Sequence, residues 1–429
     1  MSTRSLLARL EAAQPIVARR DMYYRGDQVL RFMVDRVDGS VMGFRSNLAR
    51  VAVNAVAERI WLRDVTAAVR GRDCSERARK LVQDCDLPML LQSIVTDMLA
   101  VGSAYLIVWV GADGRPVVTG ESAEQVAVER DPVTRGVTGA VKRWQVTDAN
   151  GVLIEEHVVN YGPDKIVHLV RDEQAGKLRF VNSVPNPLGV VPVVPLVNIE
   201  RIHDDVGTSV VDDLAPLLDA LNKLIVDMMT TSESVARPKR WATGVNLDDD
   251  EVDGFVADGG FTADGIDEVV EVADEGVRAP FRDADDMWVS EQAEAKFGQL
   301  PGADMTGYQT AVDLIMQQVM AVTSLPAHMV GITTANPSTA EALRASEVAL
   351  SSTAASRVRV VNRPVEWAVR LLVAIDAGVS PDEVEVEVSW ADTATRSVAQ
   401  AADAAVKLAG ENIINSEQAS EMVDAGKDI

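Results

Sequence analysis

The sequence contains few cysteines, histidines and aromatic residues. Its 429 residues include two cysteines and four histidines, and aromatic residues make up 4% of the chain. Cys74 and Cys85 do not form a CxxC pair, and a disulfide framework needs more cysteines than this. We therefore interpret both as reduced thiols, as is usual for a cytosolic setting.

Long apolar runs are absent as well. The opening stretch MSTRSLLARLEAAQ carries charges where a signal peptide has its apolar core. No apolar run reaches the ~18 residues that a membrane-spanning helix requires. The richest run, VVPVVPLV at 190–197, contains two prolines, which exclude a helix there. The sequence thus predicts neither a secretion signal nor a membrane span.

The motifs of common enzyme classes are also missing. There is no Walker A loop, no GxGxxG and no HExxH. The four histidines are scattered, and a catalytic pair among them stays open although ordinary structural roles are favoured. They are His157, His168, His203 and His328.

Two kinds of acidic cluster have a spacing compatible with a metal ion. Aspartates at 248–250 and 285–286 offer the oxygen ligands that Mg²⁺ prefers, and His203 precedes two further aspartates. A nuclease centre needs ligands on rigid elements, which these stretches do not resemble. We interpret them as solvated or linker segments and predict no catalytic residue, no metal and no cofactor, so that an enzyme is the weaker hypothesis.

The charge balance is strongly acidic. Lys and Arg number 41 and Asp and Glu number 65, which gives a net charge of −24. A free-standing DNA-binding protein usually shows the opposite balance. Residues 248–286 hold 15 acidic and two basic residues, with glycines between them. By itself this composition also fits a partly flexible, solvated insertion.

Apolar residues recur at helical spacing in several stretches. We expect helices at 3–25, 47–62, 87–101, 212–236 and 304–325, a long helix from about 338 to 376, and short helices at 395–409 and 416–424. Ser338 and Glu341 have the spacing of a capping box at the start of the long helix. Pro364 lies inside that helix and predicts a kink or a break.

Between the helices, short apolar runs alternate with turn signals. We expect strands at 104–110, 116–119, 126–129, 137–146, 153–159, 165–170 and 384–390. Their regular spacing is typical of an antiparallel sheet. The fold class that we predict is therefore α+β.

Nine stretches, spread over most of the chain, carry a family resemblance. They are YYRGDQ (23–28), NLARVAVNAVAERI (47–60), GSAYLIVWVGADGRPVVTGESAEQVAVERDP (102–132), NPLGVVPVVPLVN (186–198), PLLDALNKLIVDMM (216–229), KRWATG (239–244), KFGQLPGADMTGY (296–308), NPSTAEALRASE (336–347) and WADTATRSVAQAADAAVKL (390–408). Each fragment is weakly diagnostic alone, and their order and number make the match specific. Together they resemble the portal proteins of tailed bacteriophages, in particular the type of long-tailed actinobacteriophages.

The resemblance implies a portal fold, with a mixed helix and antiparallel-sheet wing, a two-helix stem, a small acidic clip, a long kinked helix and a helical crown. We assign the parts in chain order. They are an N-terminal wing at 1–205, a stem helix at 206–236, the clip and return at 237–303, the second stem helix at 304–325, a tunnel loop at 326–338, the long helix and a wing strand at 339–390, and the crown at 391–429.

The resemblance also implies a function without catalysis. Such subunits form a ring, typically twelve-fold, at one capsid vertex, and double-stranded DNA passes through its channel during packaging and ejection. The implied partners are other copies of the chain, the major capsid protein, the large terminase subunit and a head–tail adaptor, with no membrane. The implied location is the virion, and the host cytoplasm during assembly. A head–tail adaptor is the alternative, which the length and the long central helix disfavour.

The resemblance places three sets of residues at the channel, the stem and the clip. For the tunnel loop we expect uncharged, flexible residues that touch DNA weakly, although an ordinary surface connection stays open. These are Pro326, His328, Gly331, Thr333, Thr334 and Asn336. For the clip we expect the acidic residues Asp248, Asp249, Asp250 and Glu251.

We further expect an acidic or neutral channel wall, because DNA affinity comes mainly from Lys and Arg contacts to phosphate. One basic ring is expected from Arg344, Arg357 or Arg359, although salt bridges within or between subunits stay open as their role. For stem packing we expect two apolar stripes that bury each other and contact the next subunit, so that Leu221→Asp or Ile315→Asp blocks assembly. The stripes contain Leu214, Leu217, Leu221, Leu224, Met228, Val312, Ile315 and Val319.

Overall fold

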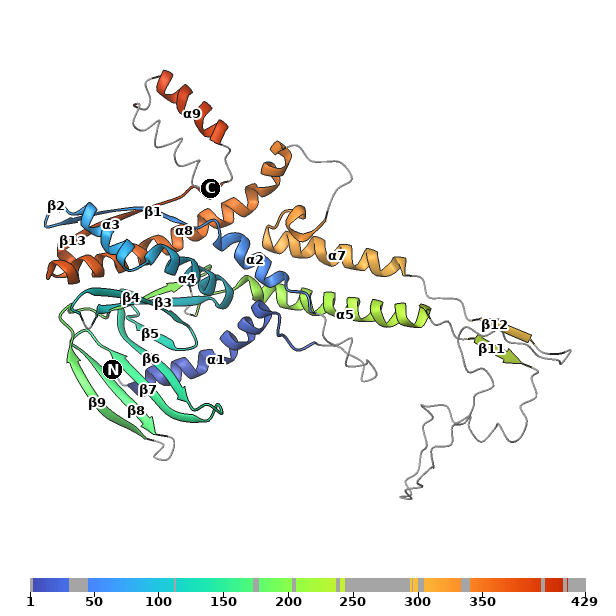
Figure 1. Ribbon diagram of the computed structural model, residues 1–429, viewed down its shortest axis with the longest axis horizontal. Helices are drawn as coiled ribbons and strands as arrows, with labels where there is room; N and C mark the ends of the chain where they lie inside the picture. The colour runs from blue at the N-terminus through green and yellow to red at the C-terminus, as the bar shows by residue number, and fades with distance from the viewer. Residues whose placement is uncertain are drawn as a thin grey trace. The chain divides into compact units, whose positions relative to one another are not determined.

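The structure is a computed structural model (Figure 1). It describes residues 3–30, 45–111, 113–172, 177–202, 206–236, 240–243, 294, 296–299, 305–332, 340–394, 398–411 and 415. The chain divides into two compact units. The first comprises Met1–Phe32, Arg45–Asn222 and Asp313–Ile429, and the second comprises Met33–Phe44 and Lys223–Val312.

Most helices of the first unit were predicted from the periodicity, whereas α3 was not. The described helices of this unit are α1 (Thr3–Arg25), α2 (Leu48–Ala57), α3 (Ser75–Asp84), α4 (Leu87–Val101), α8 (Ala340–Ala377) and α9 (Val398–Gly410). Two more helices, α5 (Val210–Ala236) and α7 (Thr306–Thr323), have residues in both units. The predicted helix at 416–424 lies outside the described residues.

One predicted helix is shorter than expected. Asn47 caps α2 by accepting a hydrogen bond from the backbone N–H of Arg50, and the helix ends at Ala57 rather than at 62. Leu62 already belongs to a strand, β1 (Leu62–Val69), which pairs with β13 (Val384–Trp390). Leu62, which was expected at the end of the helix, is therefore a strand residue and does not continue the helical face.

The described part of the first unit has antiparallel sheets, which confirms the α+β class. One sheet has the order β13-β1-β2, with β2 at Arg72–Asp73. A second has the order β10-β3-β4, formed by Val193–Val197, Ser103–Val110 and Pro116–Ser122. The expectation of one sheet over 104–170 is wrong, because the chain changes sheet after β4.

The third sheet holds five strands in sequence order. They are β5 (Val126–Arg130), β6 (Val137–Thr147), β7 (Leu153–Tyr161), β8 (Lys165–Asp172) and β9 (Leu178–Pro185). Figure 1 shows α1 lying along this sheet. Leu6, Leu7 and Leu10 of α1 form a small core with Val141 and Val158. Helix α1 thus covers one face of the sheet, as expected for elements that are apolar on one side.

The long helix α8 supports the main core. Val361, Val365 and Ala368 are fully buried, and the helix is continuous across Pro364. The break that a proline favours is therefore not found. Tertiary burial on both sides of the proline compensates for the hydrogen bond that its missing N–H cannot make.

A buried arginine fixes the start of α5. Arg20 Nη1 donates to the carbonyl of Val101 at 2.6 Å, Nη2 donates to the carbonyl of Gly207 at 3.2 Å, and the guanidinium pairs with Asp212 at 2.6 Å. Gly207 has a φ of +79°, and a Cβ added there would lie 2.0 Å from the carbonyl oxygen of Gly102. The two glycines therefore allow two backbone segments to cross where α5 begins.

The second unit is described only in part. Its strands β11 (Arg240–Thr243) and β12 (Lys296–Gln299) pair antiparallel, so the chain that leaves at Thr243 returns beside it at Lys296. Thr231 and Tyr308 place their hydroxyl oxygens 3.0 Å apart. The acidic residues 248–251 lie outside the described residues.

Candidate functional site

The segment after α7 makes a fixed turn. Thr323 Oγ1 donates to the carbonyl of Val319 at 2.7 Å and accepts from the N–H of Leu325 at 3.3 Å. Ser324 has a φ of +58°, a left-handed conformation that is unfavourable for a residue other than glycine. Leu325 is buried. The chain thus reverses at Ser324 and is fastened to the core immediately afterwards.

A short 3-10 helix, η2 (Ala327–Val330), follows this turn. Pro326 precedes it in an extended conformation, and Gly331 ends it at a φ of +78° while donating its N–H to the carbonyl of Ala327. Met329 and Val330 pack against the main core. The described part of the predicted loop is therefore folded, whereas Thr333, Thr334 and Asn336 lie outside the described residues.

His328 of η2 contacts Glu347 of α8, which in turn contacts Arg59, two residues beyond the end of α2. Its Nε2 lies 3.3 Å from Glu347 Oε1, and Glu347 Oε2 lies 3.3 Å from Arg59 Nη2. Glu347 and Arg59 are largely buried, whereas His328 is more exposed. The sequence contains no local signal for this set, because the three residues are far apart in the chain.

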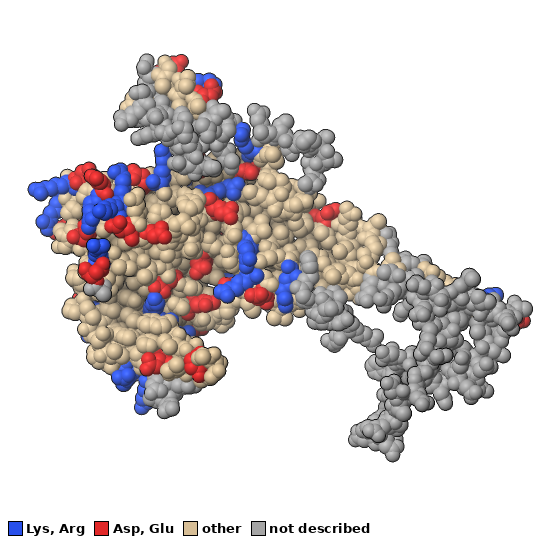
Figure 2. Space-filling model, in the orientation of Figure 1, with Lys and Arg blue, Asp and Glu red and all other residues tan. Residues whose placement is uncertain are grey.

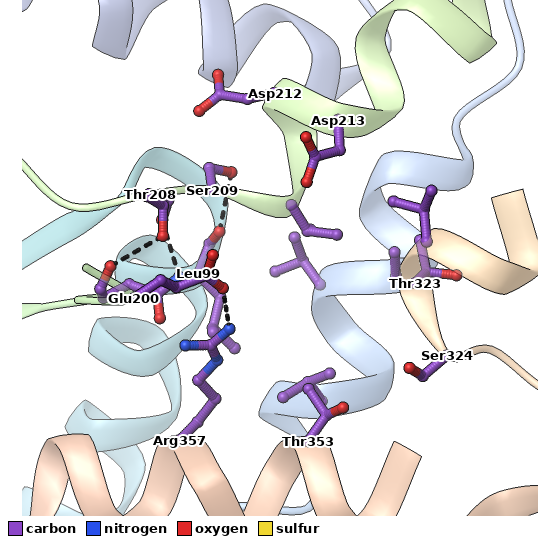
Figure 3. Close-up of a pocket in the computed structure, with 16 residues that line it drawn as sticks. Leu99, Glu200, Thr208, Ser209, Asp212, Asp213, Thr323, Ser324, Thr353 and Arg357 are labelled. Atoms are coloured by element: carbon purple, nitrogen blue, oxygen red, sulfur yellow. Dashed lines mark hydrogen bonds and ion pairs between the residues drawn. The ribbon is translucent and has the colours of Figure 1, made fainter. Parts of the chain in front are cut away.

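Next to the turn lies a cavity of about 310 Å³ (Figure 3). Arg357 of α8 forms an ion pair with Glu200 at one side, and Thr323 and Ser324 line another side. Ser209 donates its hydroxyl to the carbonyl of Ala100 at 2.6 Å. The polar groups of the cavity are thus mostly engaged with the protein itself.

The three arginines expected at a channel occupy different environments. Arg357 is largely buried by its pairing with Glu200, which matches the salt-bridge alternative. Arg359 is exposed and Arg344 is half-buried, and neither has an ion pair among the described residues. Arg344 and Arg357 are separated by ~20 Å along a straight helix, so at most one of these positions provides a given ring of charge, and the expectation of one basic ring stays a prediction.

The residues expected to pack the stem divide by burial. Leu214 and Val319 are fully buried in one core cluster, with Leu217 and Ile315 partly buried against it. Leu221 is 3% exposed. The remaining residues, Leu224, Met228 and Val312, are half-buried.

Two polar side chains of α5 are also buried, and the helical periodicity gives no sign of this. Asp219 accepts a hydrogen bond from the Tyr23 hydroxyl at 2.8 Å, and Asn222 Oδ1 accepts one from the N–H of Ser46 at 2.8 Å. Buried polar side chains are stable when paired in this way. The first half of α5 is therefore packed on its apolar side and hydrogen-bonded through two polar side chains as well.

Two histidines that are distant in the sequence meet on the five-stranded sheet. His157 Nδ1 lies 3.0 Å from His168 Nε2, and both rings stack beside Trp144. Burial, and then the neighbouring His157, lower the pKa of His168. Among the described residues no group of three or more His, Cys, Asp or Glu side chains is placed to hold a metal ion. The two residues therefore form an aromatic cluster on the sheet, in agreement with their interpretation as sheet residues.

Charge on the first unit is largely compensated locally. Figure 2 shows basic and acidic side chains interspersed over the region of α3 and β2. Arg79 pairs with Asp64 at 2.6 Å, and Arg77 pairs with Asp376.

Burial raises the pKa of the Cys74 and Cys85 thiols, which favours their unreactive form. The raised pKa values of Cys74 and Cys85 therefore fit a structural role better than that of a reactive nucleophile.

A family model described as "Phage portal protein, SPP1 Gp6-like" matches residues 7–424. The chain belongs to this portal protein family. Residues from the wing to the crown of the predicted portal therefore lie within the family match. Among the described residues, no helix is both long and apolar enough to cross a membrane.

Two curated relatives are portal proteins of mycobacteriophages. The portal protein of Mycobacterium phage L5 is 29% identical over 298 residues, and that of Mycobacterium phage D29 is 30% identical over 298 residues. Each alignment covers 69% of this chain and 56% of the relative. The chain thus spans little more than half the length of these relatives.

Solved structures offer a more distant likeness. The chain is similar to a chain from the neck of the native GTA particle computed with C12 symmetry, with 13% identity and a TM-score of 0.49 over 95% of this chain and 98% of that one. It is also similar to a chain from the neck of the empty GTA particle computed with C6 symmetry, with 14% identity and a TM-score of 0.45 over 80% and 79%.

Proposed function

We propose that this chain is the subunit of a closed ring at one capsid vertex, through which double-stranded DNA passes during packaging and ejection. The observation that carries this proposal is the portal family match over residues 7–424. Twelve copies is the expected number. The proposed location is the portal vertex of the virion, reached by assembly in the host cytoplasm.

The parts of such a ring correspond to segments of the chain. We assign the described residues up to 202 to the wing, α5 and α7 to the stem, and α9 to the crown. The paired strands β11 and β12 bracket the acidic segment, which supports a clip at 237–303. The predicted acidic side chains of that clip, 248–251, stay a prediction.

We propose that the tunnel loop, residues 326–338, faces the DNA. Its described residues include no Lys or Arg, and the largely buried Arg357 is paired with Glu200. Because phosphate affinity depends on cationic contacts, such a surface lets a duplex slide. Arg359 is the exposed arginine best suited to a basic ring at the channel. We further propose a channel wall that is otherwise acidic or neutral.

The proposed role is structural and not catalytic. The ring gives the major capsid protein, the large terminase subunit and a head–tail adaptor surfaces on which to dock, and it needs no cofactor. Any catalysis that packaging needs is then carried out by a docked partner. The absence of a phosphate-binding loop in this sequence supports that division.

Negative-stain electron microscopy of the purified full chain tests the proposal. The expected particles are closed rings with a central hole. Purified protein that stays monomeric at all concentrations, or that hydrolyses ATP or DNA by itself, would refute it.

A further inference from the structure

A second hollow of the first unit carries an unusual charge for this acidic chain. It is a groove of about 880 Å³ between the β5–β6 turn, the segment 190–195 and the middle of α8. Four arginines line it, and Glu366 is the acidic residue among its lining side chains. The arginines are Arg130, Arg135, Arg363 and Arg370. In a protein with a net charge of −24, four arginine side chains gathered in one groove indicate a site for an anionic ligand.

The turn that presents Arg135 is rigid. Asp131 Oδ1 accepts hydrogen bonds from the N–H groups of Val133 at 2.8 Å and Thr134 at 2.7 Å, and these bonds lower the pKa of Asp131. Arg135 has a φ of +63°, a conformation that favours glycine, and its Nη2 donates to the carbonyl of Ile202 at 2.9 Å. An arginine is thus held in place where a small residue would fit the backbone better.

Helix α8 presents the opposite side of the groove. Arg363 is exposed and has neither a hydrogen bond nor an ion pair with other described residues. The Arg370 guanidinium lies 5.6 Å from the centre of the Trp367 ring, and its buried Nε has no hydrogen-bond partner there. Glu366 accepts a hydrogen bond from Asn362 Nδ2 at 2.9 Å, so its carboxylate is partly engaged within the helix.

The floor of the groove is apolar. Val137, Val190 and Trp367 line it and are half-buried, so that they keep apolar surface accessible above the fully buried Val193 and Val194. A nucleic acid backbone offers phosphates and sugars but no apolar side chains to such a floor. An amphipathic peptide offers carboxylates to the arginines and apolar side chains to the valines and to Trp367. Tryptophan and arginine are also the residues that most often dominate protein–protein binding energy.

We propose that this groove, which we call the arginine groove, binds an acidic peptide segment of a partner protein that carries both carboxylate and apolar side chains. Arg135 and Arg363 bind the carboxylates from opposite sides, because a guanidinium fork matches a carboxylate bidentately. Trp367 contacts the apolar residues. The proposal concerns the protomer surface and does not depend on whether the chain closes into a ring.

Fluorescence anisotropy with the full chain tests this proposal. The probe is a short fluorescein-labelled peptide in which glutamate and leucine alternate, compared with its counterpart carrying glutamine in place of glutamate. We expect the glutamate peptide to bind more tightly, and the double variant R135E/R363E to weaken binding by about tenfold or more. Trp367→Ala is expected to weaken it as well.

The matched control is Arg179→Glu, which reverses the charge of an exposed arginine on β9, outside the groove. It is expected to bind the glutamate peptide as the parent does. Equal affinity for both peptides, or equal weakening by Arg179→Glu, would overturn the proposal. So would tighter binding of a short DNA duplex that the groove variants abolish, since the ligand would then be phosphate. A changed oligomeric state of R135E/R363E in sedimentation would instead identify a second copy of the chain as the occupant, and would also overturn it.

Discussion

At the scale of single residues, the crossing of two backbones controls where α5 begins. The carbonyl of Gly102 lies where a Cβ of residue 207 would be, and Arg20 binds carbonyls on both crossing segments. Neither glycine stands out in the sequence, because each is an isolated glycine near the end of a predicted element. Only the fold brings residues 102 and 207 together.

Gly207→Ala is therefore expected to destabilise the protein severely, by several times the ~1–2 kcal/mol that a left-handed alanine costs alone. The control is Gly189→Ala, at a φ of +68° with no atom within 4 Å of the added Cβ. Urea denaturation followed by circular dichroism measures both variants. Similar losses of stability in the two would contradict the close approach.

Residue roles could be predicted from the sequence only where they are local. The helical stripe correctly marked Leu214 and Val319 as buried, because periodicity reports which face is apolar. Asp219 and Asn222 lie on the face of α5 opposite to that stripe, yet both are buried and hydrogen-bonded. Their partners, Tyr23 and the N–H of Ser46, come from distant parts of the chain, which no periodicity can reveal.

At the scale of elements, the turn between α7 and α8 is more ordered than its composition suggests. Pro, Gly, Thr and Asn predict an irregular loop, and residues 327–330 instead form a 3-10 helix. The contacts that hold it, from His328 through Glu347 to Arg59, are tertiary. We infer that this turn provides a fixed base for the residues that follow it.

Glu347→Gln tests that anchoring while preserving the shape of the side chain. Removing the charge weakens the contacts to Arg59 and His328, and hydrogen bonds to charged groups contribute ~1.5–3 kcal/mol. We expect amide hydrogen exchange of residues 327–332 to become about tenfold faster or more. Glu387→Gln, on an exposed position of β13, is the control and is expected to leave this exchange unchanged. Unchanged exchange in Glu347→Gln would mean that apolar packing alone holds the turn.

Strands were predicted where alternation or apolar runs were strong. A strand was predicted at 104–110, and β3 spans Ser103–Val110. Strand β9 was not predicted, since its residues are almost all exposed and it is defined by pairing with β8. Likewise the end of α2 depends on the pairing of β1 with the distant β13. Strands whose own residues lack alternation or an apolar run, and which are defined by pairing, are those that sequence reasoning misses.

At the scale of the whole molecule, the proposed ring has to form in spite of the acidity of the chain. A net charge of −24 on each copy opposes close packing of identical chains. Local ion pairs such as Arg79 with Asp64 reduce the charge that a neighbour would meet. Apolar contact must then provide most of the free energy that holds a ring together.

The residues available for that contact are the apolar ones that the protomer leaves exposed. Leu221 is 3% exposed, so an aspartate there would disrupt the protomer itself, at a cost above ~4 kcal/mol. Leu314 on α7 is 59% exposed. Substituting it does not open the protomer core, and we propose that it removes apolar contact with a neighbouring copy. Leu314 is therefore a better probe of assembly than Leu221 or the partly buried Ile315.

Leu314→Asp is expected to prevent ring formation and to leave the melting temperature of the protomer close to that of the parent. Full burial of one leucine contributes ~1.5–3 kcal/mol, and in a closed ring this loss recurs at every interface. Sedimentation velocity measures the assembly, and circular dichroism measures the melting of material kept dilute enough to be monomeric. Val152→Asp, which places the same charge on an exposed valine of the β6–β7 turn, is the control and is expected to assemble normally. Rings of Leu314→Asp as stable as those of the parent would exclude this face of α7 from the subunit interface, and apolar contacts elsewhere on the protomer would have to hold the ring.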